Sequence, residues 1–356
     1  MIAKGSAWLL AFAALAFGLR PAEAAPPKGT PLLILLPPEA LPLDVGAGGF
    51  VLVGGFFSGG GMNWMPTSGA RSLGGLQATA VSRDGKTIVG DALDAGGLQN
   101  AAIWSGGTPW RTLGSFTPAA QPCDFDLSVA LGTSADGRVV VGLGWNGCGH
   151  ARAFRWEEST GMVDLGSLTG QSTRANGISG DGRVVIGWEE SNGPRLGAKW
   201  VERAQEMIRG PFGPVGEAHA ANSDGSIIVG SRCNFNDPRA TAWKWTAAGV
   251  QCFPVDRPRD LPNLPYGAFM LGTSEDGRVI GGAFSFGLDS ESLVWFDGEV
   301  LFLKDYLRQN GVPDAFEGWI NTGFVQSVTP DGRILVGYGA GPTTFQGYMV
   351  VLPKLD

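Results

Sequence analysis

The sequence has few of the residues on which most enzyme chemistry depends. Only two His and four Tyr occur among 356 residues, and no Gly-x-Ser-x-Gly motif is present. A hydrolase triad requires a His beside a nucleophile and an orienting acid. No group of His, Cys and Asp has the spacing of a zinc site either. The composition therefore argues against a catalytic triad and a bound metal, and we expect no cofactor.

Long hydrophobic runs are also missing. The run Trp8–Leu19 has about a dozen residues, whereas a membrane-spanning helix needs roughly 20. It follows Lys4 and precedes Ala22-Glu23-Ala24, and this order is typical of a signal peptide with a small-x-small cleavage site. We therefore expect residues 1–24 to be removed and the mature chain to be secreted or periplasmic, without a membrane span.

An excess of basic residues is missing as well. The chain has 26 Lys and Arg against 33 Asp and Glu, which gives a formal net charge of −7. Nucleic acids and anionic membranes favour clustered Lys and Arg. We expect neither as a partner.

Glycine, proline and tryptophan are abundant, with 57 Gly, 23 Pro and 12 Trp. The glycines lack the three-residue period of collagen, and the aromatic content argues against disorder. Such a composition is typical of many short strands joined by tight turns.

One phrase recurs along the chain: Ser-x-Asp-Gly, then a short β-branched or apolar run, then Gly. Its Asp-Gly step predicts a tight turn between two strands. The copy at Ser223 is interpreted as one residue shorter, and the first copy is degenerate. The closing glycines are spaced by a mean of about 47 residues, which is the length of a propeller blade. They are Gly54, Gly90, Gly142, Gly187, Gly230, Gly282 and Gly337.

These repeats predict an all-β fold, a seven-bladed β-propeller of four-stranded antiparallel blades, with six or eight blades as alternatives. The third strand ends on Trp in most copies, and the phrase Leu-Gly-x-Leu, as in Leu165–Leu168, is predicted to form the fourth. Small residues crowd the first strand, where blades converge. Residues 25–356 form one domain, with repeats at about 41–76, 77–116, 128–168, 173–212, 217–254, 268–303 and 322–352.

The two chain ends predict how the ring closes. The last repeat stops before its fourth strand, while residues 31–36 form a surplus strand before the first repeat. We expect residues 31–36 to complete the last blade as its outer strand, which would leave only short, protected edges.

The fullest repeat carries a family resemblance. It reads His150-Ala-Arg-Ala153-Phe154-Arg-Trp156, followed by Gly161-Met-Val-Asp164-Leu165-Gly166, and resembles the bacterial extracellular repeats named HAF after a His-Ala-Phe phrase. The resemblance covers about residues 41–352. Most copies here lack the His, and Asp-Gly replaces the Asn-x-x-Gly common in the family. The resemblance implies secretion and a propeller-like architecture, and it implies no established chemistry.

The four cysteines predict two disulfides in a secreted chain. Cys123 and Cys148 are predicted to lie on one face of one blade. Cys233 and Cys252 belong to another blade, on its second and fourth strands. Those strands are about 9.6 Å apart, so this bridge requires the loop after Cys233 to fold over the third strand.

The connections between strands divide into two faces. The Asp-Gly turns are short and uniform, and we call their side the turn face. Long irregular connections share the other side, the variable face: 116–125, 145–152, 232–239, 256–266 and 304–319. Binding residues are usually found on variable loops of a rigid scaffold. The candidate binding residues are Trp145, Asn146, His150, Asn234, Asn236 and Arg239.

Two functions remain open at this stage. The first is a monomeric, non-catalytic module that binds a protein or a polysaccharide. The second is a lyase or glycosidase acting in the central depression, which needs paired carboxylates or a Tyr/His/Arg cluster on converging loops. With four Tyr and two His in the chain, we favour the binding module.

Overall fold

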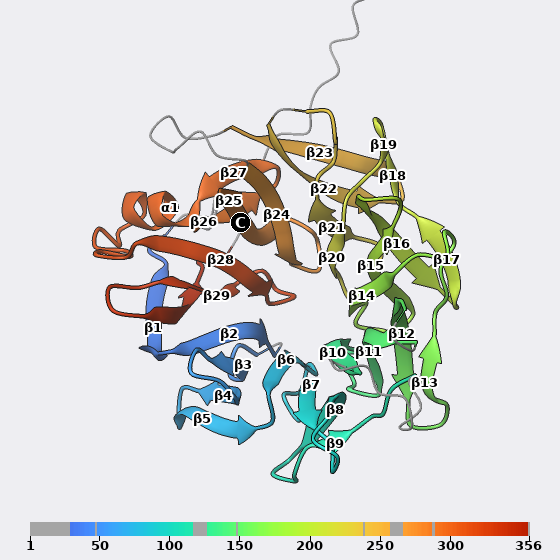
Figure 1. Cartoon of the computed structure of the whole chain (residues 1–356). Coiled ribbons are helices and arrows are strands. Elements are labelled where there is room, and N and C mark those ends of the chain that lie inside the picture. The colour runs from blue at the N-terminus through green and yellow to red at the C-terminus, as the bar shows by residue number, and fades with distance from the viewer. Residues whose placement is uncertain are drawn as a thin grey trace, which may run out of the picture.

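The computed structural model describes residues 29–46, 48–116, 127–146, 149–237, 239–256, 266–286 and 289–354. Seven four-stranded antiparallel sheets form a ring, which confirms the predicted seven-bladed propeller (Figure 1). The first strands of neighbouring blades contact one another around the centre of this ring. Among the described residues, no helix is long and apolar enough to span a bilayer.

The strands follow the repeat order closely, with the innermost strand first in blades 1 to 6. Blade 1 has β2 (Ala40–Val45), β3 (Leu52–Phe56), β4 (Gly61–Met65) and β5 (Gly69–Gly74); blade 2 has β6 (Gln77–Val81), β7 (Thr87–Leu93), β8 (Gln99–Ser105) and β9 (Arg111–Thr112); blade 3 has β10 (Ser128–Thr133), β11 (Val139–Trp145), β12 (Ala151–Glu157) and β13 (Gly161–Asp164); blade 4 has β14 (Thr173–Ile178), β15 (Val184–Glu190), β16 (Arg195–Val201) and β17 (Ala204–Met207).

The remaining blades add a small hairpin and one helix. Blade 5 has β20 (Ala218–Ala221), β21 (Ile228–Ser231), β22 (Ala240–Thr246) and β23 (Gly249–Val255), preceded by the hairpin β18 (Arg209–Gly210) and β19 (Gly213–Pro214); blade 6 has β24 (Tyr266–Thr273), β25 (Val279–Phe286), β26 (Asp289–Phe296) and β27 (Glu299–Phe302), followed by α1 (Leu303–Gln309); blade 7 has β28 (Asn321–Val328), β29 (Ile334–Ala340) and β30 (Phe345–Val351).

The ring closes through its N-terminal strand, as predicted. β1 (Leu32–Pro38) pairs antiparallel with β30, the third strand of blade 7, and in Figure 1 this blue strand lies against the red end of the chain. Leu36 is buried in a cluster that joins Met349 of blade 7 to Leu52 of blade 1. A strand from the start of the chain therefore completes the last blade.

The Ser-x-Asp-Gly phrase forms the turn between the first two strands of blades 2, 3, 4 and 6, and Thr329 replaces the Ser in blade 7. In blade 3, the Ser134 hydroxyl donates to Asp136 Oδ1 at 2.6 Å, and the Arg138 N–H donates to the same oxygen at 3.0 Å. The following Gly137 has φ +72°. The aspartate carboxylate therefore accepts hydrogen bonds within the turn. This role explains why the residue recurs, without any bound ligand.

Three expectations about the repeat were wrong in detail. The blade 5 copy is not shorter, because Asn222 takes the place of Ser: its Oδ1 accepts the Ile227 N–H at 3.0 Å. The Leu-Gly phrase does not form the fourth strand in blade 3, since β13 ends at Asp164 and Leu165 is buried at the exit, before Gly166 at φ +78°.

The third error concerns residues 304–319, which were predicted to be an irregular loop of the variable face. Part of this stretch is α1, and its side chains enter the largest apolar cluster, between blades 6 and 7. The rings of Phe316 and Tyr348 meet edge-on at 5.0 Å. This segment is therefore part of the core.

Candidate functional site

A β-bulge interrupts the innermost strand of every blade at the same place. In blade 5, for example, Ala218 pairs with Gly230 and Ala220 with Val229, so that His219 is left without a partner in the register. An extra residue of this kind turns its side chain out of the regular alternation. The seven bulge residues all line a central channel of about 460 Å³: Leu43, Thr79, Leu131, Asn176, His219, Leu271 and Gln326.

Polar groups inside the channel are tied to neighbouring blades. Thr79 Oγ1 donates to the Ala130 carbonyl at 2.8 Å, and Asn176 Nδ2 donates to the Ala218 carbonyl at 2.7 Å. The Asp44 carboxylate accepts from Ser327 Oγ at 2.7 Å and from the Val81 N–H at 2.9 Å, so it links blades 7, 1 and 2. Burial raises the pKa of Asp44 despite these hydrogen bonds. These contacts are structural, because they join adjacent blades.

The two ends of the channel differ. At the turn face, the guanidinium of Arg83 in blade 2 reaches across the channel and donates to Ser223 Oγ in blade 5. The backbone N–H of Ser223 in turn donates to Glu275 of blade 6 at 3.2 Å. Side chains therefore bridge the channel at the turn face.

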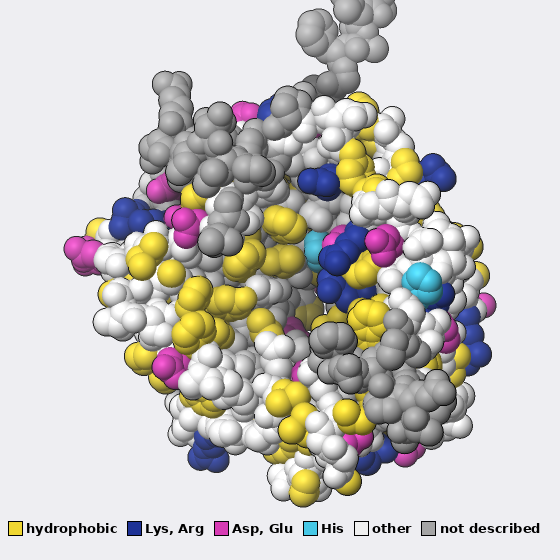
Figure 2. All heavy atoms as spheres, in the orientation of Figure 1, with side chains coloured by type: hydrophobic (Ala, Val, Ile, Leu, Met, Phe, Trp, Pro, Cys, Tyr) yellow, Lys and Arg dark blue, Asp and Glu magenta, His cyan; other side chains and the backbone are white. Residues whose placement is uncertain are grey.

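At the variable face, the channel meets a charged cluster. Glu217 lies between two arginines, with contacts of 3.3 Å to Arg174 and 3.3 Å to Arg195. Both guanidinium groups lie over the ring of Trp188, at 5.4 and 4.5 Å from its centroid. Figure 2 shows basic side chains, an acidic one and a histidine on one side of the central hollow and hydrophobic side chains on the other.

His219 lies next to this cluster, in the wall of the channel. Its Nε2 is 3.1 Å from Ser231 Oγ, and its ring is 6.1 Å from the ring of Phe269. Burial lowers the pKa of His219 to about 4, with Glu217 acting against the shift and Arg174 adding to it. The ring is therefore neutral at neutral pH.

A second pocket of about 370 Å³ adjoins the cluster between blades 4, 5 and 6. Its lining comes from the connections before β16 and before β20, from the start of β24 and from Arg232, Asn234, Phe235, Asp237 and Arg239 between β21 and β22. We call it the arginine pocket because its lining includes Arg195, Arg232 and Arg239.

The second group of candidate residues belongs to this pocket in part. Asn234 and Arg239 line it, whereas Asn236 is not among its lining residues. Asn234 Oδ1 accepts the Asn236 N–H at 2.9 Å, and Arg239 forms a two-point contact with Asp237 at 3.1 and 3.0 Å. This loop is therefore braced by its own side chains.

The same loop is held by a disulfide. Cys233 is bonded to Cys252 in β23, with 5.6 Å between their Cα atoms. The Asn234 N–H donates to Thr241 Oγ1 of β22 at 3.3 Å, so the loop does fold over the third strand, as this bridge was predicted to require. The predicted Cys123–Cys148 pair lies outside the described residues.

The first group of candidates forms a separate loop on blade 3. Asn146 and His150 exchange contacts: the Asn146 N–H donates to the His150 carbonyl at 3.1 Å, and the His150 N–H donates to Asn146 Oδ1 at 3.2 Å. Trp145, the last residue of β11, is half-buried. None of these three residues lines the arginine pocket, which lies between blades 4, 5 and 6, so the structure does not bring the two groups together.

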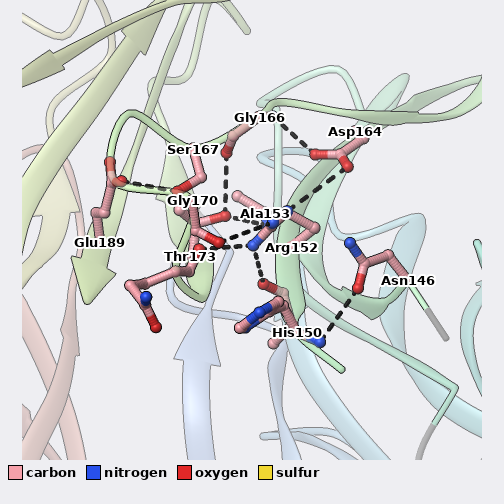
Figure 3. A network of polar contacts seen from close by, with 12 residues as sticks. Asn146, His150, Arg152, Ala153, Asp164, Gly166, Ser167, Gly170, Thr173 and Glu189 are labelled. Atoms are coloured by element: carbon pink, nitrogen blue, oxygen red, sulfur yellow. Dashed lines mark hydrogen bonds and ion pairs between the residues drawn. The ribbon is translucent and has the colours of Figure 1, made fainter. Parts of the chain in front are cut away.

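The blade 3 loop rests on a firmly bonded connection to blade 4 (Figure 3). Arg152 donates to the carbonyls of Gln171 at 2.6 Å and Gly170 at 3.2 Å, and Ser167 Oγ donates to Glu189 at 2.8 Å. Thr173 Oγ1 accepts the Ala153 N–H at 2.9 Å. This part of the variable face is thus a fixed platform.

Sequence reasoning predicted Asn234 and Arg239 of the arginine pocket but missed the charged residues at which the two cavities meet. Arg174, Arg195 and Glu217 stood in ordinary strand positions or turns, with no spacing that linked them. The bulges had one visible signal, the Ala-x-Ala or Ala-x-Gly pattern of several first strands, as in Ala78–Ala80. Within the described ranges, no group of three or more His, Cys, Asp or Glu could hold a metal ion.

Comparison with protein-family models and with curated proteins finds no match for this chain. Solved structures are similar to it. An oligogalacturonate lyase from Vibrio parahaemolyticus is similar over 92% of this chain and 99% of its own, with a TM-score of 0.57 and 12% identity. The WD40 repeats of RRP9 are similar over 93% and 100%, with a TM-score of 0.53 and 12% identity.

TolB from Acinetobacter baumannii is similar over 76% of this chain, with a TM-score of 0.45 and 12% identity, and this chain spans only 65% of it. At such identities the similarity shows the propeller fold alone. A lyase is among these structures, so the shared fold does not decide between binding and catalysis.

Proposed function

We propose that this chain is a secreted, monomeric binding module without catalytic activity, which takes a polysaccharide or a protein on its variable face. The observation that carries the proposal is the difference between the two ends of the channel. Arg83 crosses it at the turn face, whereas a pocket of about 370 Å³ adjoins it at the variable face. Loops held on a rigid scaffold are the usual place for binding residues.

Secretion is supported by two features of the chain. The N-terminal order of Lys4, an apolar run and Ala22-Glu23-Ala24 is that of a signal peptide. The Cys233–Cys252 disulfide suits an oxidising compartment, since cytosolic thiols are kept reduced. The resemblance to HAF repeats also supports secretion.

A non-catalytic role is supported by how the polar groups of the channel are used. Asp44 accepts hydrogen bonds from three residues in three blades, and Asn176 links blade 4 to blade 5. Among the described residues that line the channel there is no Tyr. The alternative, a propeller lyase or glycosidase, would have to work through His219 and its charged neighbours.

The test compares three variants of the mature chain on an array of acidic and neutral glycans and in a pull-down. The first carries Trp145→Ala, Asn146→Ala and His150→Ala, and the second Asn234→Ala, Asn236→Ala and Arg239→Ala. The control carries Lys86→Ala and Arg138→Ala, two exposed residues of the turn face. We expect at least one variable-face variant to lose binding at a nearly unchanged melting temperature, while the control binds normally.

Two results would overturn this proposal. If the turn-face control loses binding while both variable-face variants keep it, the assignment of the face is wrong. If the wild-type chain turns over a glycan and His219→Gln abolishes that turnover, the enzyme alternative takes its place.

A further inference from the structure

The arginine pocket has an excess of positive charge in an acidic protein. Arg239 is neutralised by Asp237 through its two-point contact. Of the remaining charges in its lining, Arg195 and Arg232 stand against the single carboxylate of Glu217. Glu217 also contacts Arg174 in the adjoining channel wall. Two guanidinium groups against one carboxylate leave one positive charge in the lining, although the whole chain has a net charge of −7. The pocket is therefore suited to an anion.

Arg232 is held toward the pocket by a strained backbone. Its φ is +59°, which a non-glycine residue rarely adopts. Two hydrogen bonds fix this conformation, from the Arg232 N–H to the Thr241 carbonyl at 2.6 Å and from the Gly216 N–H to the Arg232 carbonyl at 2.8 Å. The disulfide of Cys233 follows directly. Such strain persists only where the surroundings enforce it, and it is common at binding sites.

The side chain of Arg232 is available to a ligand. It is exposed, its guanidinium lies 5.2 Å from the centre of the Phe235 ring, and it makes no ion pair with any residue of the described chain. Arg195 is half exposed and makes one contact of 3.3 Å with Glu217. A guanidinium stacked on an aromatic ring keeps its N–H edge free for a carboxylate, which it can bind in two-point fashion.

The other groups of the pocket suit a sugar. Phe235 and Phe269 give apolar walls on which the C–H face of a sugar ring can pack, and Asn234 offers a side-chain amide. Glu217 and Asp237 are acceptors that can receive hydrogen bonds from the hydroxyl groups of a sugar. A ligand with both a carboxylate and hydroxyl groups can bind the arginines through its carboxylate and the acidic side chains through its hydroxyl groups.

We propose that the arginine pocket binds an acidic saccharide, with the carboxylate of a uronic acid held between Arg195 and Arg232. This inference rests on the proposed binding function and names its ligand class. The pocket joins the charged rim of the channel through Glu217, which contacts both Arg195 in the pocket and Arg174 in the channel wall. A chain of several sugar units could therefore extend from the pocket toward the channel.

The test is titration calorimetry on the mature chain with trisaccharides of galacturonate, glucuronate and mannuronate. A neutral hexose trisaccharide and inorganic phosphate are the comparison ligands. The variant carries Arg195→Gln and Arg232→Asn, since Asn tolerates a positive φ better than most residues. The control carries Arg138→Gln and Arg183→Gln, which remove the same charge from exposed turns of the opposite face.

We expect at least one uronate trisaccharide to bind, and the pocket variant to weaken it by about tenfold or more, while the control stays within about twofold. Equal binding of the neutral trisaccharide, competition by equimolar phosphate, or unchanged affinity in the pocket variant would each overturn the inference. One of these results can occur while an alanine variant of either loop still loses the binding of another glycan or of a protein. In that case this inference is wrong and the proposed binding function stands. If no variable-face variant alters binding, the proposed function fails with it.

Discussion

At the residue scale, the seven bulge positions have similar backbones and different side chains. Three are Leu43, Leu131 and Leu271, and the other four are polar. Only His219 among them carries an ionisable side chain. The repeat therefore sets where these side chains point. The residue type at each bulge position sets the chemistry at that point of the channel.

His219 should make the protein sensitive to acid. Burial lowers its pKa in the folded protein to about 4, against the ordinary 6.5. Between these values only the unfolded state takes up the proton, so the free energy of unfolding falls as the pH decreases from about 6.5 to 4. His219→Gln keeps a polar group near Ser231 and removes this proton uptake. We expect its melting temperature to fall less than that of the wild type between about pH 7 and pH 4.5.

The matched control for this measurement is His150→Gln, which removes the other histidine from a loop of the variable face. An acid response of His219→Gln equal to that of the wild type would contradict the buried, neutral state of this ring.

At the scale of the element, the Asp-Gly turns also join neighbouring blades. A Cβ on Gly137 of blade 3 would lie 2.5 Å from Thr87 Oγ1 of blade 2, and a Cβ on Gly225 of blade 5 would lie 2.6 Å from a methyl group of Val184 in blade 4. The backbone adds further links, such as the Ala135 N–H donating to the Gly180 carbonyl at 2.9 Å. The repeated glycine thus serves both the turn and the contact between blades.

Two alanine substitutions separate these roles. Gly137 and Gly161 have similar φ values of +72° and +65°, but a Cβ on Gly161 would meet nothing within 4 Å. We expect Gly161→Ala to cost about 1–2 kcal/mol from the positive φ. Gly137→Ala should cost about 1–3 kcal/mol more, because its methyl group also collides with Thr87. Urea unfolding of both variants measures the difference, and equal losses would show that the turn does not pack against blade 2.

At the scale of the whole molecule, the ring depends on one strand that is distant in sequence. β1 pairs with β30 through Leu32, Leu33, Ile34 and Leu35, and its side chains join the core between blades 7 and 1. A propeller whose last blade lacked this strand would expose an edge and open its first and last blades. Stability of the ring therefore depends on residues near the start of the chain.

Neighbouring leucines of β1 give the test. Leu36 is 1% exposed and Leu35 is 47% exposed. We expect Leu36→Ala to lower the free energy of unfolding by about 2–5 kcal/mol, and Leu35→Ala to change it by about 0.5 kcal/mol or less. Deletion of residues 29–37 should lower the melting temperature sharply. A truncated chain that melts like the full one would contradict closure by this strand.

The sequence by itself determined the repeating part of this protein. The period of the Ser-x-Asp-Gly phrase predicted seven blades, and the missing strand at one end with a surplus strand at the other predicted closure. These features could be predicted because turn formation by Asp-Gly and strand formation by β-branched runs depend on neighbours in the chain. The repeat pattern did not predict small departures from itself, such as Asn222 in place of Ser and the end of the fourth strand before Leu165.

Only the tertiary structure decided the cavities and their chemistry. Arg83 and Ser223 meet across 140 positions of sequence, and Ser327 and Asp44 across 283. Arg174, Arg195 and Glu217 come together because two strands and a connection end at one rim. Their side chains have no local pattern, since what each one contacts is set by the curvature of the ring and by the bulge in each innermost strand.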